Sequence, residues 1–159
     1  MAEKPLDEKT LETMIEELRR MNDWVDHAYQ RVKTKTLTFL GGGLAVLTFL
    51  YSNGETFIPT ETYGRIFYFC GLGAVLGAII MLFAALLPRM WEFSIESKDI
   101  DTVEKYSGVE YLKYVKDRLF LTYRTNIETY DKNQRLLNRS FYPLVFGAII
   151  LVVLKIFGA

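Results

Sequence analysis

Aromatic and cationic side chains gather on the polar segments of the sequence. Tyr111, Tyr114 and Arg118 fall on adjacent turns of one predicted helix, and Arg89 directly follows a long apolar run. Two aromatic rings beside a guanidinium could stack on a planar ligand and pair with its phosphate. The same residues also suit a helix-helix seam, where tyrosine buries an apolar body and keeps a polar tip at the surface. A planar phosphate-bearing ligand and plain helix packing therefore remain alternatives at these four residues.

Catalytic and metal-binding patterns find little support. The chain has one histidine, His27, and one cysteine, Cys70, which excludes a disulfide framework and a zinc site built from several cysteines or histidines. No recognisable nucleophile motif or glycine-rich phosphate loop is present. With 19 basic and 19 acidic side chains, the chain has no net field that would attract a nucleic acid polymer. We expect a non-enzymatic protein with no metal and no cofactor.

The elements that must position these residues include long apolar runs. Apolar residues make up 50% of the chain and charged residues 24%, and the two kinds are segregated along the sequence. A helix over 34–52 rises roughly 28 Å, close to the hydrocarbon thickness of a bilayer. We predict transmembrane helices over 34–52, 66–87 and 141–159. Lys155 lies near the far end of the third, where a long side chain can snorkel to the interface. The alternative for that segment is a hydrophobic helix lying on the membrane or on a partner.

Basic residues flank the predicted spans asymmetrically. Arg31 and Lys33 precede the first span and Lys35 marks its entry, whereas the loop at 53–65 offers only Arg65. Cytoplasmic loops carry the excess of lysine and arginine in multi-pass proteins. We therefore expect residues 1–33 and 88–140 in the cytoplasm, with an external loop at 53–65 and an external carboxy terminus.

The two cytoplasmic segments have helical periodicity. Apolar residues recur at steps of three and four from Leu11 to Val32, and again from Leu112 through Tyr123 and Ile127 toward the third run, which is typical of amphipathic helices. Neither pattern is broken before its span, although Pro143 is expected to kink the last helix. We predict an all-α membrane protein with three transmembrane helices, in which long cytoplasmic helices, the second from about residue 107, continue into the first and third spans. The pattern over 89–106 predicts no definite structure.

The first two predicted spans contain small residues and, beyond Lys35 at the entry of the first, no acidic or basic side chain. Gly42 and Gly43 lie in the first, and Gly73 and Gly77 form a GxxxG pair in the second. Such residues let helix backbones approach closely within a bilayer. These contacts could form within one chain or between chains. The lack of intramembrane charge argues against a proton relay or an ion-coupled transporter.

The arrangement resembles a known family. Two features carry the likeness: a second span that ends in Leu86-Leu87-Pro88-Arg89, and a last cytoplasmic helix that contains Asn133-Gln134-Arg135-Leu136-Leu137-Asn138-Arg139. Together with the amphipathic first helix, they resemble the Pycsar transmembrane effectors over nearly the whole chain, and more broadly the SLATT membrane effectors of bacterial defence systems.

The resemblance implies a prokaryotic antiviral effector of the bacterial inner membrane. Such a protein forms a homo-oligomer in the lipid bilayer, binds a cyclic nucleotide made by a partner cyclase on infection, and then impairs the membrane and stops the infected cell. A different hypothesis is a membrane scaffold that tethers a soluble partner through its cytoplasmic helices. A constitutive holin-like pore is a third, although holins usually have simpler cytoplasmic parts.

Overall fold

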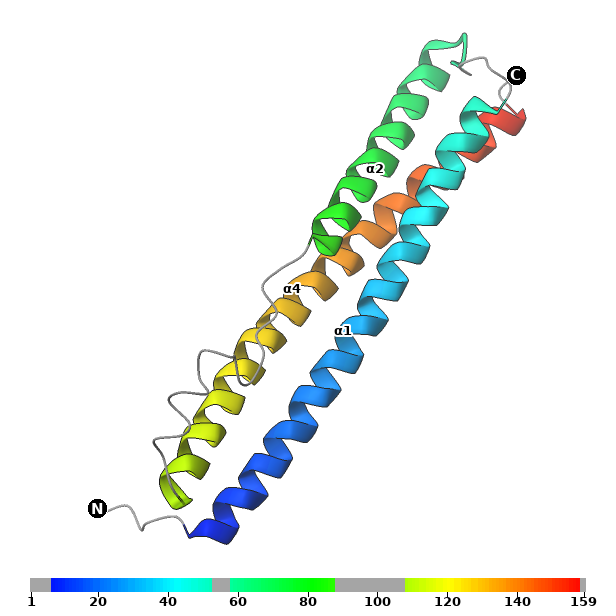
Figure 1. Ribbon diagram of the computed structural model, residues 1–159. Coiled ribbons are helices and arrows are strands. Elements are labelled where there is room, and N and C mark those ends of the chain that lie inside the picture. Colours follow the sequence, from blue (N-terminus) through cyan, green and yellow to red (C-terminus); the bar gives the residue numbers. More distant parts are fainter. Residues whose placement is uncertain (1–6, 53–57, 88–107, 158–159) are drawn as a thin grey trace. The chain divides into compact units, whose positions relative to one another are not determined.

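Three helices form the described part of the chain. The computed structural model describes residues 7–52, 58–87 and 108–157. They form α1 (Glu8–Tyr51), α2 (Thr62–Leu86) and α4 (Gly108–Phe157), with no strand among them (Figure 1). The all-helical prediction is therefore confirmed, and each long amphipathic helix continues without interruption into its apolar run. Arg89, the rest of 88–107, and part of the predicted external loop lie outside the described residues.

Local interactions explain where two of the helices begin. Asp7 precedes α1, and its Oδ1 atom accepts a hydrogen bond from the backbone N–H of Thr10 at 2.8 Å, as an N-cap does. Hydrogen bonds from Thr10 lower the pKa of the Asp7 carboxyl below its usual value. The second helix begins at Thr62, ahead of the apolar run that starts at Ile66. The Arg65 side chain bonds back to the Pro59 carbonyl at 2.9 Å and fixes the chain as it enters this helix.

The chain divides into two compact units. Unit 1 comprises 1–30 and 89–131, and unit 2 comprises 31–88 and 132–159. Helices α1 and α4 each contribute residues to both units, whereas α2 belongs to unit 2 alone.

In unit 1, α1 and α4 run in the same direction and share an apolar seam. Ile15 packs with Val115 and Leu119 at its centre. The Asn22 amide donates to the Leu119 carbonyl at 3.2 Å, and farther along both helices Trp24 meets Tyr130 edge-on with ring centroids 6.1 Å apart. Buried or half-buried residues of α1 recur at alternating steps of four and three: Leu11, Ile15, Leu18, Asn22, Val25 and Tyr29. This spacing is that of a parallel coiled coil.

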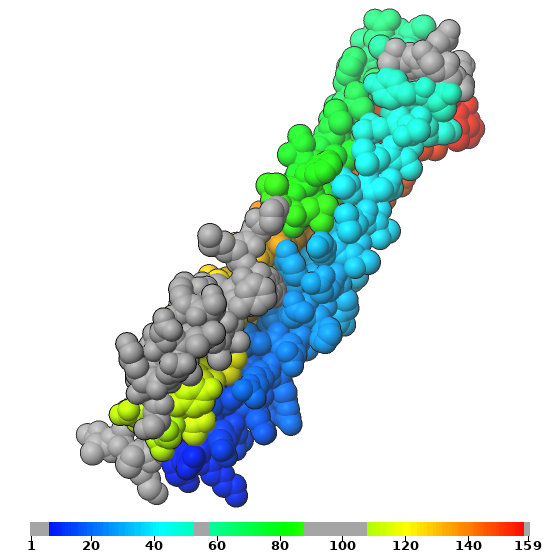
Figure 2. Space-filling view, viewed as in Figure 1, coloured from blue at the N-terminus to red at the C-terminus, as the bar shows by residue number. Residues whose placement is uncertain are grey.

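In unit 2, all three helices pack together, with α2 antiparallel to the other two (Figure 1). Gly43 of α1 lies between Leu144 of α4 and Ile79 of α2, where an added Cβ would come within 3.0 and 3.1 Å of their side chains. Figure 2 shows the end of α1 that belongs to unit 2, in cyan, lying against α2, in green. The absence of a side chain at Gly43 therefore allows the three helices to converge.

Two of the described helices, α2 and α4, are long and apolar enough to cross a membrane. Only 33% and 22% of their apolar windows are buried, whereas the core helix of a soluble protein would be mostly buried. The run at 34–52 in α1 does not reach this hydropathy, because Lys35, three glycines and several threonines dilute its leucines and phenylalanines. The structure therefore supports two candidate spans by composition, rather than the three predicted.

Candidate functional site

Three of the four predicted ligand residues lie on the first turns of α4. Tyr111 and Tyr114 are half-buried and pack against the cluster of Ile15, Val115 and Leu119 in unit 1. Arg118 follows one turn later, also half-buried and engaged in an interaction of its own. Helix α4 thus brings Tyr111, Tyr114 and Arg118 onto neighbouring turns, while Arg89 is outside the described residues. The contacts of the two tyrosines are those of a helix-helix seam.

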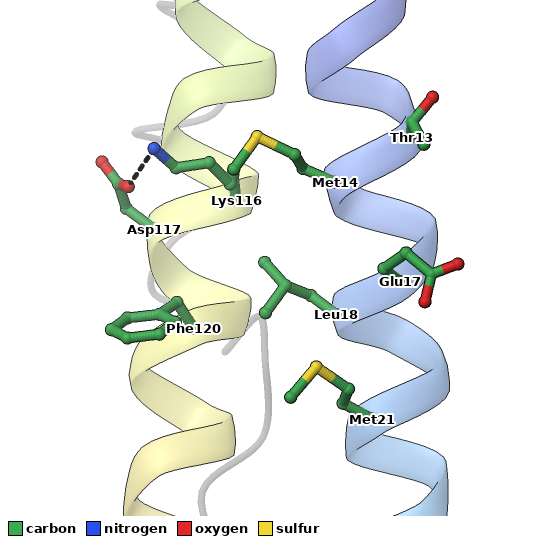
Figure 3. A pocket seen from close by; sticks show the side chains of 8 residues that line it. All are labelled: Thr13, Met14, Glu17, Leu18, Met21, Lys116, Asp117 and Phe120. Atoms are coloured by element: carbon green, nitrogen blue, oxygen red, sulfur yellow. Dashed lines mark ion pairs between the residues drawn. The ribbon is translucent and has the colours of Figure 1, made fainter.

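A groove opens between α1 and α4 on another face of unit 1. Its volume is about 620 Å³, and Figure 3 shows Met14, Leu18 and Met21 extending from α1 toward α4. Phe120 contributes an apolar surface from α4, and Thr13, Glu17, Lys116 and Asp117 complete the lining. Methionine fills irregular apolar space and adapts to different partners. The groove therefore has the chemistry of a site for an apolar helix face.

Charged side chains of both signs border this groove, which we call the methionine groove. On α1, Glu17 pairs with Arg20 at 3.0 Å; on α4, Lys116 pairs with Asp117 at 3.0 Å. Exposed pairs of this kind contribute little stability. Within residues 7–52, 58–87 and 108–157, no group of three or more acidic, histidine or cysteine residues could hold a metal ion.

The buried face of α4 becomes polar after Leu119, a feature that the sequence analysis missed. Four buried residues, which we call the polar seam, continue the alternating spacing of Val115 and Leu119: Thr122, Asn126, Thr129 and Asn133. The predicted face instead ran through Tyr123 and Ile127, and both are only half-buried. The polar seam could have been found from the coiled-coil repeat of 3.5 residues, which places these threonines and asparagines on the buried face. A repeat of 3.6 residues instead favours the face that carries Tyr123.

Asn133 has an unusual environment within this seam. Its side chain is 1% exposed, and neither its amide nitrogen nor its amide oxygen has a hydrogen-bond partner. Asn126, earlier in the seam, is equally deep but does have an interaction partner. Leaving a buried amide unpaired costs free energy.

The glycines that make close contacts in unit 2 are only partly those singled out from sequence. An added Cβ on Gly147 of α4 would lie 2.7 Å from the carbonyl oxygen of Gly71 on α2, so these two backbones are in direct contact. Gly43 packs as described above. At Gly42, Gly73 and Gly77, an added Cβ would meet nothing within 4 Å. Within the described chain the close helix approach thus uses Gly71 and Gly147.

Lys155 caps the end of α1. Its ammonium donates hydrogen bonds to the carbonyls of Phe49 and, at 3.0 Å, of Leu50, and it lies 4.7 Å from the centre of the Phe49 ring. The last carbonyls of a helix lack partners within the helix and carry partial negative charge. Lys155 therefore ties α4 to the end of α1, in addition to any reach toward the membrane interface.

Comparison with protein-family models, with curated proteins and with solved structures gave no match.

Proposed function

We propose that the chain is a three-span membrane effector without enzymatic activity. The exposed apolar surface of unit 2 is the observation that supports a location in the membrane. Large apolar side chains point away from its packed interior on all three helices, among them Leu44 on α1, Phe69, Ile80 and Phe83 on α2, and Phe146, Ile149 and Ile156 on α4. Apolar surface on this scale is unstable in water and stable in hydrocarbon.

The packing of α1 supports a third span despite its lower hydropathy. Gly43 contacts both α2 and α4, and Lys155 near the end of α4 bonds to the end of α1. If α2 and α4 cross a bilayer, the 34–52 part of α1 lies alongside them at the same depth. Glycine and threonine are also common in spans that pack against other helices. The distribution of basic residues favours a cytoplasmic location for unit 1, and the resemblance to bacterial defence effectors implies a prokaryotic cell.

The effector part of the proposal concerns coupling between a ligand and the membrane. Unit 1 is built from α1 and α4, and the same two helices continue into unit 2. A ligand that prefers one arrangement of the helix pair would shift the population of that arrangement. We propose a cyclic nucleotide as this ligand, Arg89, Tyr111, Tyr114 and Arg118 as its binding residues, and loss of inner-membrane integrity through a homo-oligomer as the outcome, in antiviral defence.

Thermal unfolding tests the ligand. The purified protein in detergent is heated with each of a panel of cyclic mononucleotides and cyclic oligonucleotides. A ligand present at 100 times its Kd stabilises the folded state by about 2.7 kcal/mol, so Tm must rise measurably. We expect one nucleotide to raise the Tm of the native protein and of Arg124→Gln, but not that of Arg118→Gln. Arg124 is a matched control because it is exposed on the same helix and pairs with Glu128.

Release of a trapped dye from liposomes tests the membrane effect. We expect leakage when the stabilising nucleotide is added to vesicles containing the protein, and none with Arg118→Gln. A folded protein that no nucleotide stabilises would refute the nucleotide part of the proposal. Stabilisation without leakage would refute the membrane effect and favour a scaffold that binds a soluble partner.

A further inference from the structure

The methionine groove has apolar residues at positions beside the helix-helix seam, where a two-helix coiled coil usually has polar residues. Met14 and Met21 are seven residues apart on α1, each three places after a seam residue, and both are 40% exposed. On α4, Phe120 directly follows the seam residue Leu119 and is 55% exposed. In a two-stranded coiled coil these flanking positions face water and are usually charged.

Apolar residues beside the seam indicate a further helix. A helix with an apolar stripe wider than one seam packs against neighbours on two sides. In unit 1, α4 covers the side of α1 that carries Ile15, and the side that carries Met14 and Met21 opens into the groove. The apolar lining and the volume of about 620 Å³ suit the side chains of another helix.

We propose that the methionine groove binds the methionine groove of a second copy of this chain, forming a parallel dimer of helix pairs. The charges along the groove support this occupant. Glu17 of α1 and Lys116 of α4 both line the groove, and each belongs to an ion pair within its own helix. A two-fold axis along the helices places α1 of one copy against α4 of the other, so Glu17 of each copy can meet Lys116 of its partner. Such an interface is self-complementary, as two-fold symmetry requires.

The parallel orientation rests on the proposed function. Copies that insert into one membrane with the same topology have their cytoplasmic helices pointing the same way, which brings equivalent groove residues to the same height. The proposal thereby specifies the surface on which the homo-oligomer assembles: a pair of grooves in unit 1, separate from the glycines of unit 2.

Cysteine cross-linking in native membranes tests the interface. Cys70 is exposed, so the background variant is Cys70→Ser. Single cysteines are introduced by Met14→Cys, Met21→Cys and Phe120→Cys in the groove. The control is Asp23→Cys, an exposed α1 position between Asn22 and Trp24 on the face away from the groove. Membranes are oxidised with copper phenanthroline, and dimers are detected on non-reducing gels.

We expect the groove cysteines to form disulfide-linked dimers, with at least fivefold more dimer than Asp23→Cys. Equal cross-linking at all four positions, or none at the groove positions, would overturn the proposal. Groove cysteines linked to a different protein would overturn it as well, in favour of a scaffold with a soluble partner. Alkaline extraction of the same membranes shows separately whether the chain is an integral membrane protein, so failure of the interface is distinguished from failure of the proposed function.

A charge placed in the groove provides a second test. We expect Met21→Glu to raise the dimer dissociation constant about tenfold or more, because the two-fold axis brings two buried carboxylates together. Asp23→Glu, which keeps the charge on the far side of α1, should leave it unchanged. The mass of the detergent-solubilised protein over a dilution series gives both constants. Equal dissociation constants for native protein and Met21→Glu, with the helix content intact, would overturn the proposal.

Discussion

Lys155 illustrates how one charged side chain can serve packing inside an apolar segment. Its ammonium is held by the carbonyls of Phe49 and Leu50 and by the face of the Phe49 ring. Each contact compensates part of the cost of withdrawing a cation from water. From sequence, Lys155 was expected to snorkel toward the interface. The carbonyl partners could not be foreseen, because they depend on α1 and α4 ending at the same level.

Substitution of Lys155 tests this role. We expect Lys155→Met to lower the free energy of unfolding by about 1–2 kcal/mol, because the last carbonyls of α1 lose a charged donor. Lys155→Arg should retain most of the stability, since a guanidinium also donates to carbonyls. Denaturant titration of the purified protein in mild detergent measures both. If Lys155→Met were as stable as the native protein, the contact would contribute nothing and the snorkelling interpretation would suffice.

At the scale of elements, the sequence predicts the helices well and their contacts less well. Continuous helices from about Leu11 and from about residue 107 into the apolar runs follow from unbroken periodicity, and α1 and α4 confirm them. The glycines show the limit. Gly73 and Gly77 match a packing motif, yet Gly71 and Gly147 make the contact within the chain. A motif shows that a helix can be approached closely, but the neighbouring helix determines which face is used.

The glycine contact gives a matched pair of variants. We expect Gly147→Ala to destabilise unit 2 by about 1–3 kcal/mol, because its methyl group would lie 2.7 Å from a backbone oxygen of α2 that cannot move independently. Gly77→Ala should leave the monomer as stable or slightly more stable, since its surroundings are open and alanine favours helix. Unfolding in detergent compares them. Equal destabilisation by both variants would contradict the described packing. Weaker self-association of a stable Gly77→Ala variant would instead place Gly77 between chains.

The polar seam of α4 also yields a stability prediction. Asn133 is buried with both amide atoms unpaired, whereas Asn126 is buried with a partner. We expect Asn133→Leu to stabilise the protein by about 1–3 kcal/mol, because leucine is similar in size to asparagine and has no polar atom to leave unpaired. Asn126→Leu should destabilise it, since its partner would lose an interaction. Thermal unfolding of the two variants provides the comparison. Destabilisation by Asn133→Leu would mean that the amide has a partner in the native assembly, such as water or a second copy.

At the scale of the whole molecule, the proposed three-span topology can be distinguished from one in which only α2 and α4 cross the bilayer. Composition supports α2 and α4 as spans, and the proposed third span rests on the packing of α1 against them. The two topologies differ in whether the polar first half of α1 and the end of α1 lie on opposite sides of the membrane. With three spans, Asp23 is cytoplasmic and Ser52 is external. If α1 does not cross, these two residues lie on the same side.

Accessibility of single cysteines distinguishes these topologies. In the Cys70→Ser background, we expect a membrane-impermeant maleimide to label Ser52→Cys and Phe157→Cys on intact cells. Asp23→Cys and Glu128→Cys should react only after lysis, because both would be cytoplasmic. All four positions are exposed in the structure, so a lack of labelling reports on the bilayer and not on burial. Labelling of Asp23→Cys together with Ser52→Cys on intact cells would exclude a span in α1. Labelling of Glu128→Cys on intact cells, with Phe157→Cys protected, would show that the topology is the opposite of the one proposed. Unit 1 would then meet its ligand outside the cytoplasm.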